Sequence, residues 1–233
     1  MLILAIEACG LPASAALVCD GKTVAEVTVN NKLNHSVTLM PMIDYLFRIT
    51  ELDLSDVDYI AVSTGPGSFT GLRIGAGTAK GLAHGAGKRI VGVPSLDALA
   101  CNIFNAGEII APVMDARRGQ VYTCFYERRG DRLDRLTDYM TLDIDECVDR
   151  VLGFGKNAVF LGDGTLVYGE KILRASEKFS LAPLNNNMQR AASVGLAAML
   201  DVSNAVTYNN LSLFYLRKPQ AEREYEERRV CLP

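Results

Sequence analysis

Short apolar runs and longer segments of helical periodicity alternate along the chain. The first apolar run covers residues 3–7 and ends in an acid. Residues 14–19 and 23–29 follow it, with the turn Asp20-Gly21 between them. Runs of this length bounded by turn residues are typical of buried strands. Their alternation with helical segments predicts an α/β fold.

The same plan recurs about one domain length later. An apolar run over 109–115 again ends in an acid, and strand candidates over 120–126 and from Leu133 onward follow, with the turn Arg129-Gly130-Asp131 between them. We interpret this recurrence as a duplication. The other predicted elements are helices over 35–50, 70–85, 95–104, 144–152 and 189–200, and strands over 58–63, 90–93 and 158–162.

Two domains follow from this plan. We expect an N-terminal domain over 1–106 and a C-terminal domain over 107–204, with the boundary at Asn105-Ala106-Gly107. Part of 205–233 is expected to return to the first domain.

The helix after the strand 58–63 is unusually rich in glycine. Its glycines are Gly71, Gly75, Gly77, Gly81 and Gly85. Because each glycine in a helix interior costs roughly 1 kcal/mol relative to alanine, something should pack closely against this helix. The four-residue spacing runs along the helix axis, which favours a neighbouring helix over a phosphate held at the N-terminus. A neighbour within the same domain would explain the glycines as well as a partner would.

The helix predicted over 35–50 is apolar on nearly all sides. Because the surface helix of a monomer shows one apolar stripe, two faces here require burial. One face is expected on the sheet, and the other on a partner or on a second element of the same domain. Pro41 removes a backbone hydrogen bond, so we expect the helix to begin late or to kink there.

Composition limits where the protein is expected to act and what it is expected to bind. The chain has 233 residues, of which 49% are hydrophobic, yet no apolar run approaches the roughly 20 residues of a membrane span. The opening MLILAI is interpreted as a buried strand and not as a signal peptide. Six cysteines without CxxC spacing favour reduced thiols in a cytoplasm. A net charge of −3 disfavours autonomous nucleic-acid binding, so a partner is expected to hold any polynucleotide.

Four segments are similar to successive segments of one known family. They are STGPGSFTGLRIGAGTAKGLA at 63–83, VGVPSLDALA at 91–100, MDARRGQVY at 114–122 and YLRKPQAERE at 215–224. These segments resemble the bacterial tRNA threonylcarbamoyladenosine biosynthesis family TsaB (YeaZ). The resemblance implies duplicated actin-like ATPase (ribonuclease H-like) domains with mixed sheets flanked by helices. It also implies pairing with a TsaD homologue, which transfers threonylcarbamoyl to N6 of adenosine 37 in ANN-decoding tRNAs, and a third partner, the ATPase TsaE.

The resemblance, together with the doubled apolar face and the glycine stripes, points to helices 35–50 and 70–85 as half of a four-helix interface. The expected contact residues are His35, Leu39, Met42, Ile43, Leu46, Phe69, Leu72, Arg73, Gly77, Lys80, Gly81 and His84. We expect the same surface to form a homodimer when the partner is missing. Contact with tRNA is expected to be indirect, and no membrane contact is expected.

Catalytic groups of the paralogue are missing from the chain. The segment VGVPSLDALA places Ser95 and Leu99 where TsaD-type enzymes carry the two histidines of a metal site, and neither residue can replace them. The two histidines of the chain, His35 and His84, are interpreted as a capping or interface residue and as a helix C-terminal residue. We therefore predict no catalytic residue, no metal and no cofactor.

A nucleotide site is expected only as a remnant. Ala8 and Cys9 stand where the superfamily shows hydroxyl residues that hold phosphate. The remnant set implied by the resemblance is Glu7, Asp115, Gly162, Asp163 and Gly164. We expect weak or absent ATP hydrolysis, with nucleotide binding in the millimolar range at most.

The sequence thus indicates a cytoplasmic, non-catalytic scaffold or activator subunit that pairs with TsaD. An autonomous actin-like ATPase or kinase is the first alternative, supported by the fold and opposed by Ala8 and Cys9. A glycoprotease-type metallopeptidase is the second, opposed by Ser95 and Leu99.

Overall fold

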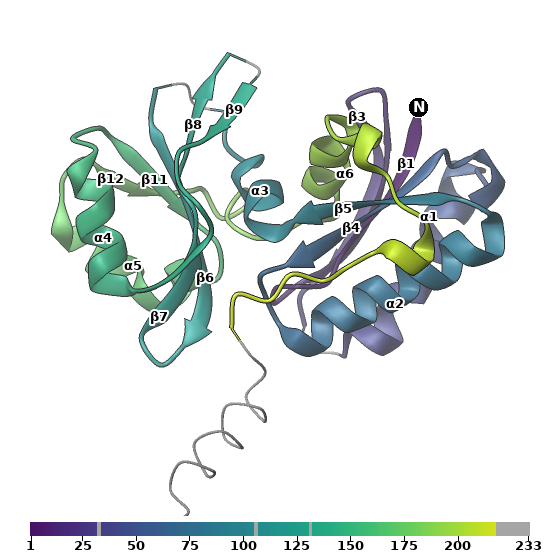
Figure 1. Cartoon of the computed structure of the whole chain (residues 1–233), viewed down its shortest axis with the longest axis horizontal. Helices are drawn as coiled ribbons and strands as arrows, with labels where there is room; N and C mark the ends of the chain where they lie inside the picture. The colour runs from purple at the N-terminus through teal and green to yellow at the C-terminus, as the bar shows by residue number, and fades with distance from the viewer. Residues whose placement is uncertain (32–33, 105–106, 131, 218–233) are drawn as a thin grey trace, which may run out of the picture.

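The computed structural model describes residues 1–31, 34–104, 107–130 and 132–217. They form two α/β lobes side by side, with the short helix α3 (Ser95–Ala100) at the junction (Figure 1). The predicted domain boundary at 105–107 and the predicted turn at 129–131 fall partly outside the described residues, as do the residues after Arg217. No helix in the described part is long and apolar enough to cross a membrane.

The first lobe is built on a five-stranded mixed sheet. Its strands are β1 (Leu2–Glu7), β2 (Ala13–Cys19), β3 (Lys22–Val29), β4 (Tyr59–Gly65) and β5 (Arg89–Pro94), in the spatial order β3-β2-β1-β4-β5. β1 is antiparallel to β2 and parallel to β4. The strands β1 and β4 are buried along nearly their whole length, as expected for strands covered on both faces.

Helices cover both faces of this sheet. Because side chains alternate along a strand, Leu4 and Ile6 of β1 pack toward α1 (His35–Thr50) and α2 (Phe69–Ala86), and Ile3 and Ala5 pack toward α6 (Ala191–Met199). α1 runs without interruption from His35 through an exposed Pro41. The expectation of a late start at Pro41 is therefore wrong.

The second lobe repeats the arrangement. Its main strands are β6 (Ile109–Arg117), β7 (Gln120–Thr123), β10 (Met140–Asp143), β11 (Ala158–Leu161) and β12 (Phe179–Leu181), in the order β10-β7-β6-β11-β12. Helices α4 (Ile144–Gly153) and α5 (Gly164–Ala175) bury apolar residues against one face. The other face packs against α3, with Ile110 and Met114 beside Leu96 and Leu99.

The structure corrects one expectation about the second half and shows two elements that the sequence did not predict. The strand predicted over 120–126 is split, because β8 (Tyr126–Arg129) turns away from β7 to pair with β6 and with β9 (Arg132–Arg135). α5 and β12 were not predicted. The short 3₁₀ turns at Leu54–Asp56, Val202–Asn204 and Tyr208–Asn210 complete the described elements.

The assignment of α6 to the second domain is wrong. α6 packs on the first sheet, where Ala192 and Val194 share a cluster with Ile3 and Val18. A β-carbon added at Gly195 would lie 2.6 Å from Val18 Cγ2, so this helix approaches the sheet very closely. The chain therefore returns to the first lobe before residue 191, earlier than the expected 205.

Candidate functional site

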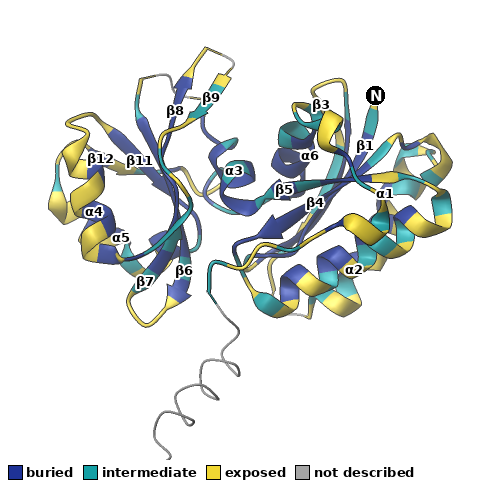
Figure 2. Ribbon diagram, viewed as in Figure 1, coloured by how far each residue is buried: buried dark blue, intermediate teal, exposed yellow. Residues whose placement is uncertain are grey.

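Exposed residues recur along the outer sides of α1 and α2 in the first lobe (Figure 2). Along α1 the apolar side chains Val37, Met40, Tyr45 and Ile49 are between 46% and 62% exposed. At roughly 100° per residue these four positions span the outer half of the helix, with Met40 and Ile49 at its two edges. A monomer would be expected to place polar residues there.

The opposite side of α1 faces the sheet. Leu39, Met42, Ile43 and Leu46 are each at most 5% exposed and belong to the core of the first lobe. The expectation that these four residues lie at a partner interface is corrected on this ground: they are already covered by their own protomer. Leu72 of α2 is corrected for the same reason, because it is 1% exposed.

The two glycine stripes of α2 differ in what they contact. A β-carbon at Gly71 would overlap the carbonyl oxygen of Ala8, and one at Gly75 would lie 3.4 Å from Ala8 Cβ. These glycines admit the β1–β2 loop and the sheet. Gly77, Gly81 and Gly85 are exposed, and nothing lies within 4 Å of a β-carbon added at any of them. The second stripe is therefore bare within the described part of the protomer.

We define the α1–α2 face as Val37, Met40, Tyr45, Ile49, Gly77, Gly81 and Gly85. Of the predicted contact residues, Arg73, Gly77, Gly81 and His84 are exposed, and His35, Phe69 and Lys80 are partly exposed. The sequence did not single out the four apolar residues of α1. The sequence shows apolar residues on every side of this helix. That pattern does not distinguish the side that is buried against the sheet from the side that is exposed.

Aromatic and basic side chains gather where α2 begins. The Arg73 guanidinium lies 3.9 Å from the centroid of the Phe69 ring, and the Phe69 ring lies 5.3 Å from that of Tyr215. Arg73 Nε also donates to the Tyr215 hydroxyl at 3.5 Å. At the other end of the helix, His84 packs against Tyr208 with ring centroids 4.4 Å apart. These contacts hold the C-terminal segment of the described chain along α2.

A cavity of about 390 Å³ lies between the lobes and brings the predicted remnant loops together. Its lining includes Cys9 and Gly10 from the β1–β2 loop, Asp115 and Arg117 from β6, and Asp163 before α5. His35 and Ser68, at the starts of α1 and α2, also line it. Glu7, Gly162 and Gly164 are not among the lining residues.

The loop amides in this cavity are bound by carboxylates of the same chain. Cys9 N donates to Glu7 Oε1 at 2.6 Å, Arg117 N to Asp115 Oδ1 at 2.9 Å and Asp115 N to Asp163 Oδ1 at 3.0 Å. Phosphate groups bind backbone amides that are free to donate. Together with the buried Ala8 and Cys9, this arrangement fits a triphosphate poorly.

Burial raises the pKa of two acids of the predicted nucleotide-site remnant, Glu7 and Asp163. It raises the pKa of Glu7, which is 0% exposed, and its hydrogen bonds from Cys9 oppose that shift only in part. Burial also raises the pKa of Asp163. Both effects favour the neutral acid, whereas an acid that positions a hydrated metal must be ionised.

The two glycines of the 162–164 loop serve close packing. Gly162 adopts φ +108°, and its missing β-carbon faces the carbonyl oxygen of Val113. A β-carbon at Gly164 would lie 2.8 Å from the same oxygen. These glycines let the loop approach β6.

The position of the paralogue's metal site holds no ligands. Ser95 Oγ accepts the amide hydrogen of Gly65 at 3.1 Å, and Leu99 is buried in the core between the lobes. In residues 1–31, 34–104, 107–130 and 132–217, no group of three or more His, Cys, Asp or Glu side chains is arranged to hold a metal ion. The donor set at this position does not fit a metal.

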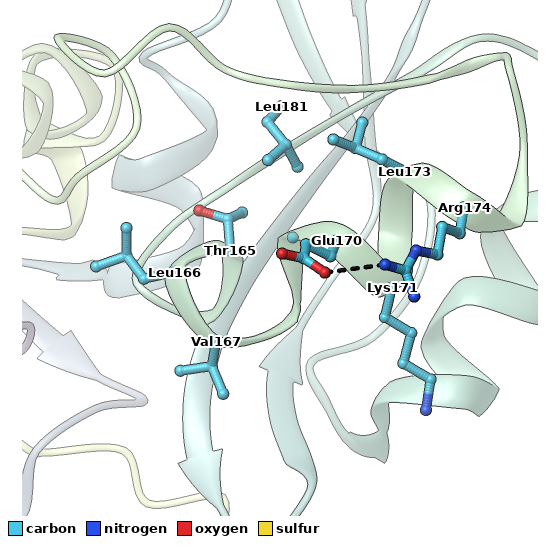
Figure 3. Close-up of a pocket in the computed structure, with 9 residues that line it drawn as sticks. Thr165, Leu166, Val167, Glu170, Lys171, Leu173, Arg174 and Leu181 are labelled. Carbon is cyan, nitrogen blue, oxygen red and sulfur yellow. Dashed lines mark hydrogen bonds and ion pairs between the residues drawn. The ribbon is translucent and has the colours of Figure 1, made fainter.

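A wider hollow lies on the outside of the second lobe, along α5 (Figure 3). Leu166, Val167 and Leu173 border it, and Glu170 and Arg174 form an ion pair of 3.1 Å within it. Lys171, the third charged residue of the lining, is paired with Asp145 of α4, so these charged groups do not converge on a common point. We assign no chemistry to this hollow.

Comparisons with known proteins identify relatives over the whole chain. A family model described as tRNA N6-adenosine threonylcarbamoyltransferase (TsaD) matches residues 22–221. The chain is 31% identical to the tRNA threonylcarbamoyladenosine biosynthesis protein TsaB of Bacillus subtilis, over 97% of this chain and 99% of that protein. It is 36% identical to TsaB of Escherichia coli over 55% of this chain and 56% of that protein. Among solved structures, YeaZ from Pseudomonas aeruginosa covers 92% of this chain and 99% of its own, with a TM-score of 0.75 and 24% identity.

Proposed function

Because this chain belongs to the TsaB (YeaZ) family of the actin-like ATPase superfamily, we propose that it is a non-catalytic scaffold subunit that pairs with TsaD. TsaD would transfer the threonylcarbamoyl group to N6 of adenosine 37 in ANN-decoding tRNAs. The relatives' names support a role in that pathway. The cytoplasm is the expected site of action, with TsaE as a third component.

The α1–α2 face is the observation that carries this proposal. Two exposed glycines in the interior of α2, Gly77 and Gly81, cost the isolated helix about 2 kcal/mol relative to alanine, and Gly85 continues their stripe into the last turn. No contact within the described part of the protomer repays that cost. Bare glycines beside exposed apolar side chains are what a closely approaching partner helix requires. A self-associated dimer through the same face is expected when TsaD is absent.

The composition of the face also suits a protein partner. Exposed apolar residues that gather on one side of a protein mark interaction surfaces more often than scattered ones do. A contact of about 800 Å² on each partner would be ordinary for a stable complex. Helices α1 and α2 would then supply two of four packed helices, with TsaD supplying the others.

The cleft supports the non-catalytic part of the proposal. Loop amides bound by the chain's own carboxylates, acids whose pKa is raised, and Ser95 and Leu99 in place of histidines all oppose ATP hydrolysis and metal chemistry by this subunit. The kinase alternative is supported by the fold alone and opposed by this cleft, and the metallopeptidase alternative is opposed by Ser95 and Leu99.

The substitution Gly81→Leu tests the interface. Leucine is a better helix former than glycine, and there is open space at this position, so the isolated chain should become about 0.5–1 kcal/mol more stable. Pairing with TsaD should nevertheless weaken at least tenfold, because the side chain would hold the helices apart. Titration calorimetry against purified TsaD measures the second effect.

A matched control is Ala175→Leu, at the exposed last residue of α5. It should leave the affinity unchanged within about twofold. Equal affinity of TsaD for the wild type and Gly81→Leu would remove the α1–α2 face from the interface. Reconstitution then tests function: tRNA threonylcarbamoylation by TsaD and TsaE should require this chain, and undiminished reaction without it would contradict the scaffold role.

A further inference from the structure

A second cavity lies at the junction of the lobes, and its lining shares no residue with the cavity described above. Its volume is about 540 Å³, within the range of roughly 300–1,000 Å³ that small-molecule sites occupy. Asp97 and Cys101 line it from α3, and Ala197 and Leu200 from α6 and its end. The remaining lining comes from β8 and β9 of the second lobe.

One part of the lining is apolar. Leu133 of β9 and Ala197 of α6 are partly exposed there, and Leu200 is 81% exposed. An apolar side chain this exposed gains nothing from the folded protomer. Together the three residues offer a surface for the apolar body of a ligand.

The charged part of the lining consists of two arginines, Arg132 and Arg135, and one acid, Asp97. Arg132 is ion-paired with Asp134, so Arg135 is the cation that an anionic ligand would meet. Asp97 already accepts hydrogen bonds from two phenols, at 2.5 Å from Tyr126 and 2.9 Å from Tyr139. Burial raises the pKa of Tyr126, which keeps that phenol protonated and donating.

Arg135 lines the cavity, and its guanidinium is fixed in position by Tyr139. Its guanidinium carbon lies 4.7 Å from the centroid of the Tyr139 ring, and its Nη1 donates to the Tyr139 hydroxyl. A planar guanidinium fixed in this way loses less conformational freedom when it binds a carboxylate or phosphate. Arg132 is engaged by Asp134 and is the weaker of the two cations for this purpose.

We propose that this cavity binds a small organic anion with an apolar body. The anionic group would pair with Arg135, and the apolar body would cover Leu133, Ala197 and Leu200. Because α3 and α6 belong to the first lobe and β8 and β9 to the second, one ligand would contact both lobes. Binding should therefore also raise the midpoint of thermal unfolding.

The fluorescent probe 8-anilinonaphthalene-1-sulfonate has this chemistry and allows a direct test. The wild type should bind it saturably, and Arg135→Gln and Leu200→Ser should each weaken binding about tenfold. Arg150→Gln and Leu184→Ser are matched controls on exposed residues outside the cavity, and both should stay within about twofold. Octanoate, which has an anionic group and an apolar chain but no rings, should displace the probe from the wild type.

The competing binding surface is the α1–α2 face, so Ile49→Ser is included. Loss of probe binding in Ile49→Ser with full binding in Arg135→Gln would overturn the proposal, and so would the absence of saturable binding to the wild type. Arg135→Lys keeps the positive charge but loses the planar guanidinium over the Tyr139 ring, so its affinity should lie between those of the wild type and Arg135→Gln. If Arg135→Gln binds the probe as tightly as the wild type while it remains folded by circular dichroism, the anion is not held by this charge and the proposal fails.

Discussion

The two lobes repeat one arrangement, in which two helices cover one face of a sheet with five corresponding strands, and the second sheet adds β8 and β9. The spatial orders β3-β2-β1-β4-β5 and β10-β7-β6-β11-β12 correspond strand by strand. α1 therefore corresponds to α4, and α2 to α5. The inward sides of both pairs are apolar and buried.

The outward sides of the two helix pairs differ. Ion pairs lie along α4 and α5: Glu146 with Arg150, Asp145 with Lys171, and Glu170 with Arg174. Among the described residues, the corresponding side of α1 has one ion pair, between Asp44 and Arg48 at 3.8 Å. Exposed apolar side chains occur on both helix pairs, because Leu166, Val167 and Leu173 of α5 are between 47% and 60% exposed. The one internal glycine of α5, Gly169, packs against Leu181, whereas Gly81 of α2 faces open space. The repeat thus fixes what each helix buries, and leaves the outer surface free to become either a solvated side or a docking side.

Glu7 at the end of β1 and Asp115 near the end of β6 form a second contrast between the lobes. Glu7 is completely buried, while Asp115 lines the cavity and lies 3.3 Å from an exposed Arg117. The two loops therefore occupy equivalent places but hold their acids in different surroundings. A sequence alignment of the repeats would treat these acids as equal, which the structure does not support.

The largest expected effect distinguishes the two sides of α1. Leu46→Ala removes a fully buried side chain from the core and should lower the free energy of unfolding by about 3 kcal/mol. Ile49→Ala, on the outer side and 50% exposed, should change it by no more than about 0.5 kcal/mol. Urea denaturation of the isolated chain measures both. Equal destabilisation by the two substitutions would mean that the outer side is also covered in the lone protein.

The next effect compares the outer sides of the two helix pairs. Ile49→Glu on α1 should weaken pairing with TsaD at least tenfold, because a charge would be buried against an apolar partner surface. Leu173→Glu on α5 places the same charge on a residue of similar exposure, 47%, and should leave pairing within about twofold. Surface plasmon resonance against immobilised TsaD gives both affinities. A larger loss for Leu173→Glu would move the docking side to the second lobe.

Much of the fold could be predicted from the sequence, and the failures have physical causes. Apolar runs with turn residues located β1, β2, β4, β6 and β11, and helical periodicity located α1 and α4. α5 was missed because Gly164 and Gly169 weaken its helical signal, although in the fold they let it approach β6 and Leu181. The break between β7 and β8 could not be predicted, because residues 120–126 read as one continuous strand in the sequence. The return of α6 to the first lobe depends on contacts between residues far apart in the chain.

The candidate site shows the same limit. Glycine spacing identified α2, and the missing histidines and hydroxyl residues identified the altered cleft. Which side of α1 is buried could not be predicted, because apolar residues occur on all its sides and only the sheet determines the inner one. The sequence prediction for that reason assigned four buried residues to the interface and not the exposed ones. The buried residues are Leu39, Met42, Ile43 and Leu46, and the exposed ones are Val37, Met40, Tyr45 and Ile49.

The smallest expected effect concerns the two strand-end acids. A carboxyl whose pKa is raised by burial binds its proton more tightly in the folded state than in the unfolded state. Its contribution to stability is therefore present at low pH and is lost as the pH rises above the ordinary carboxyl pKa through the raised one. Glu7→Gln removes this titration and keeps an oxygen that can accept from Cys9 N. At pH 5 the variant and the wild type should differ little in stability, because the protonated acid and the amide are both uncharged and both accept from Cys9 N.

As the pH rises to 8 the wild type should lose stability relative to the variant, by on the order of 1 kcal/mol. Denaturant titrations at pH 5, 6.5 and 8 measure it, and they are repeated in His35→Gln because the charge of His35 acts on Glu7. Asp115→Asn is the matched control for the second lobe, where the acid lies beside Arg117 at the cavity, and its difference from the wild type should not follow that trend. A pH-independent difference for Glu7→Gln would mean that Glu7 is ionised in the folded protein. Its carboxylate would then hold the β1–β2 loop as an anion, and the contrast between the two loops would reduce to one of exposure alone.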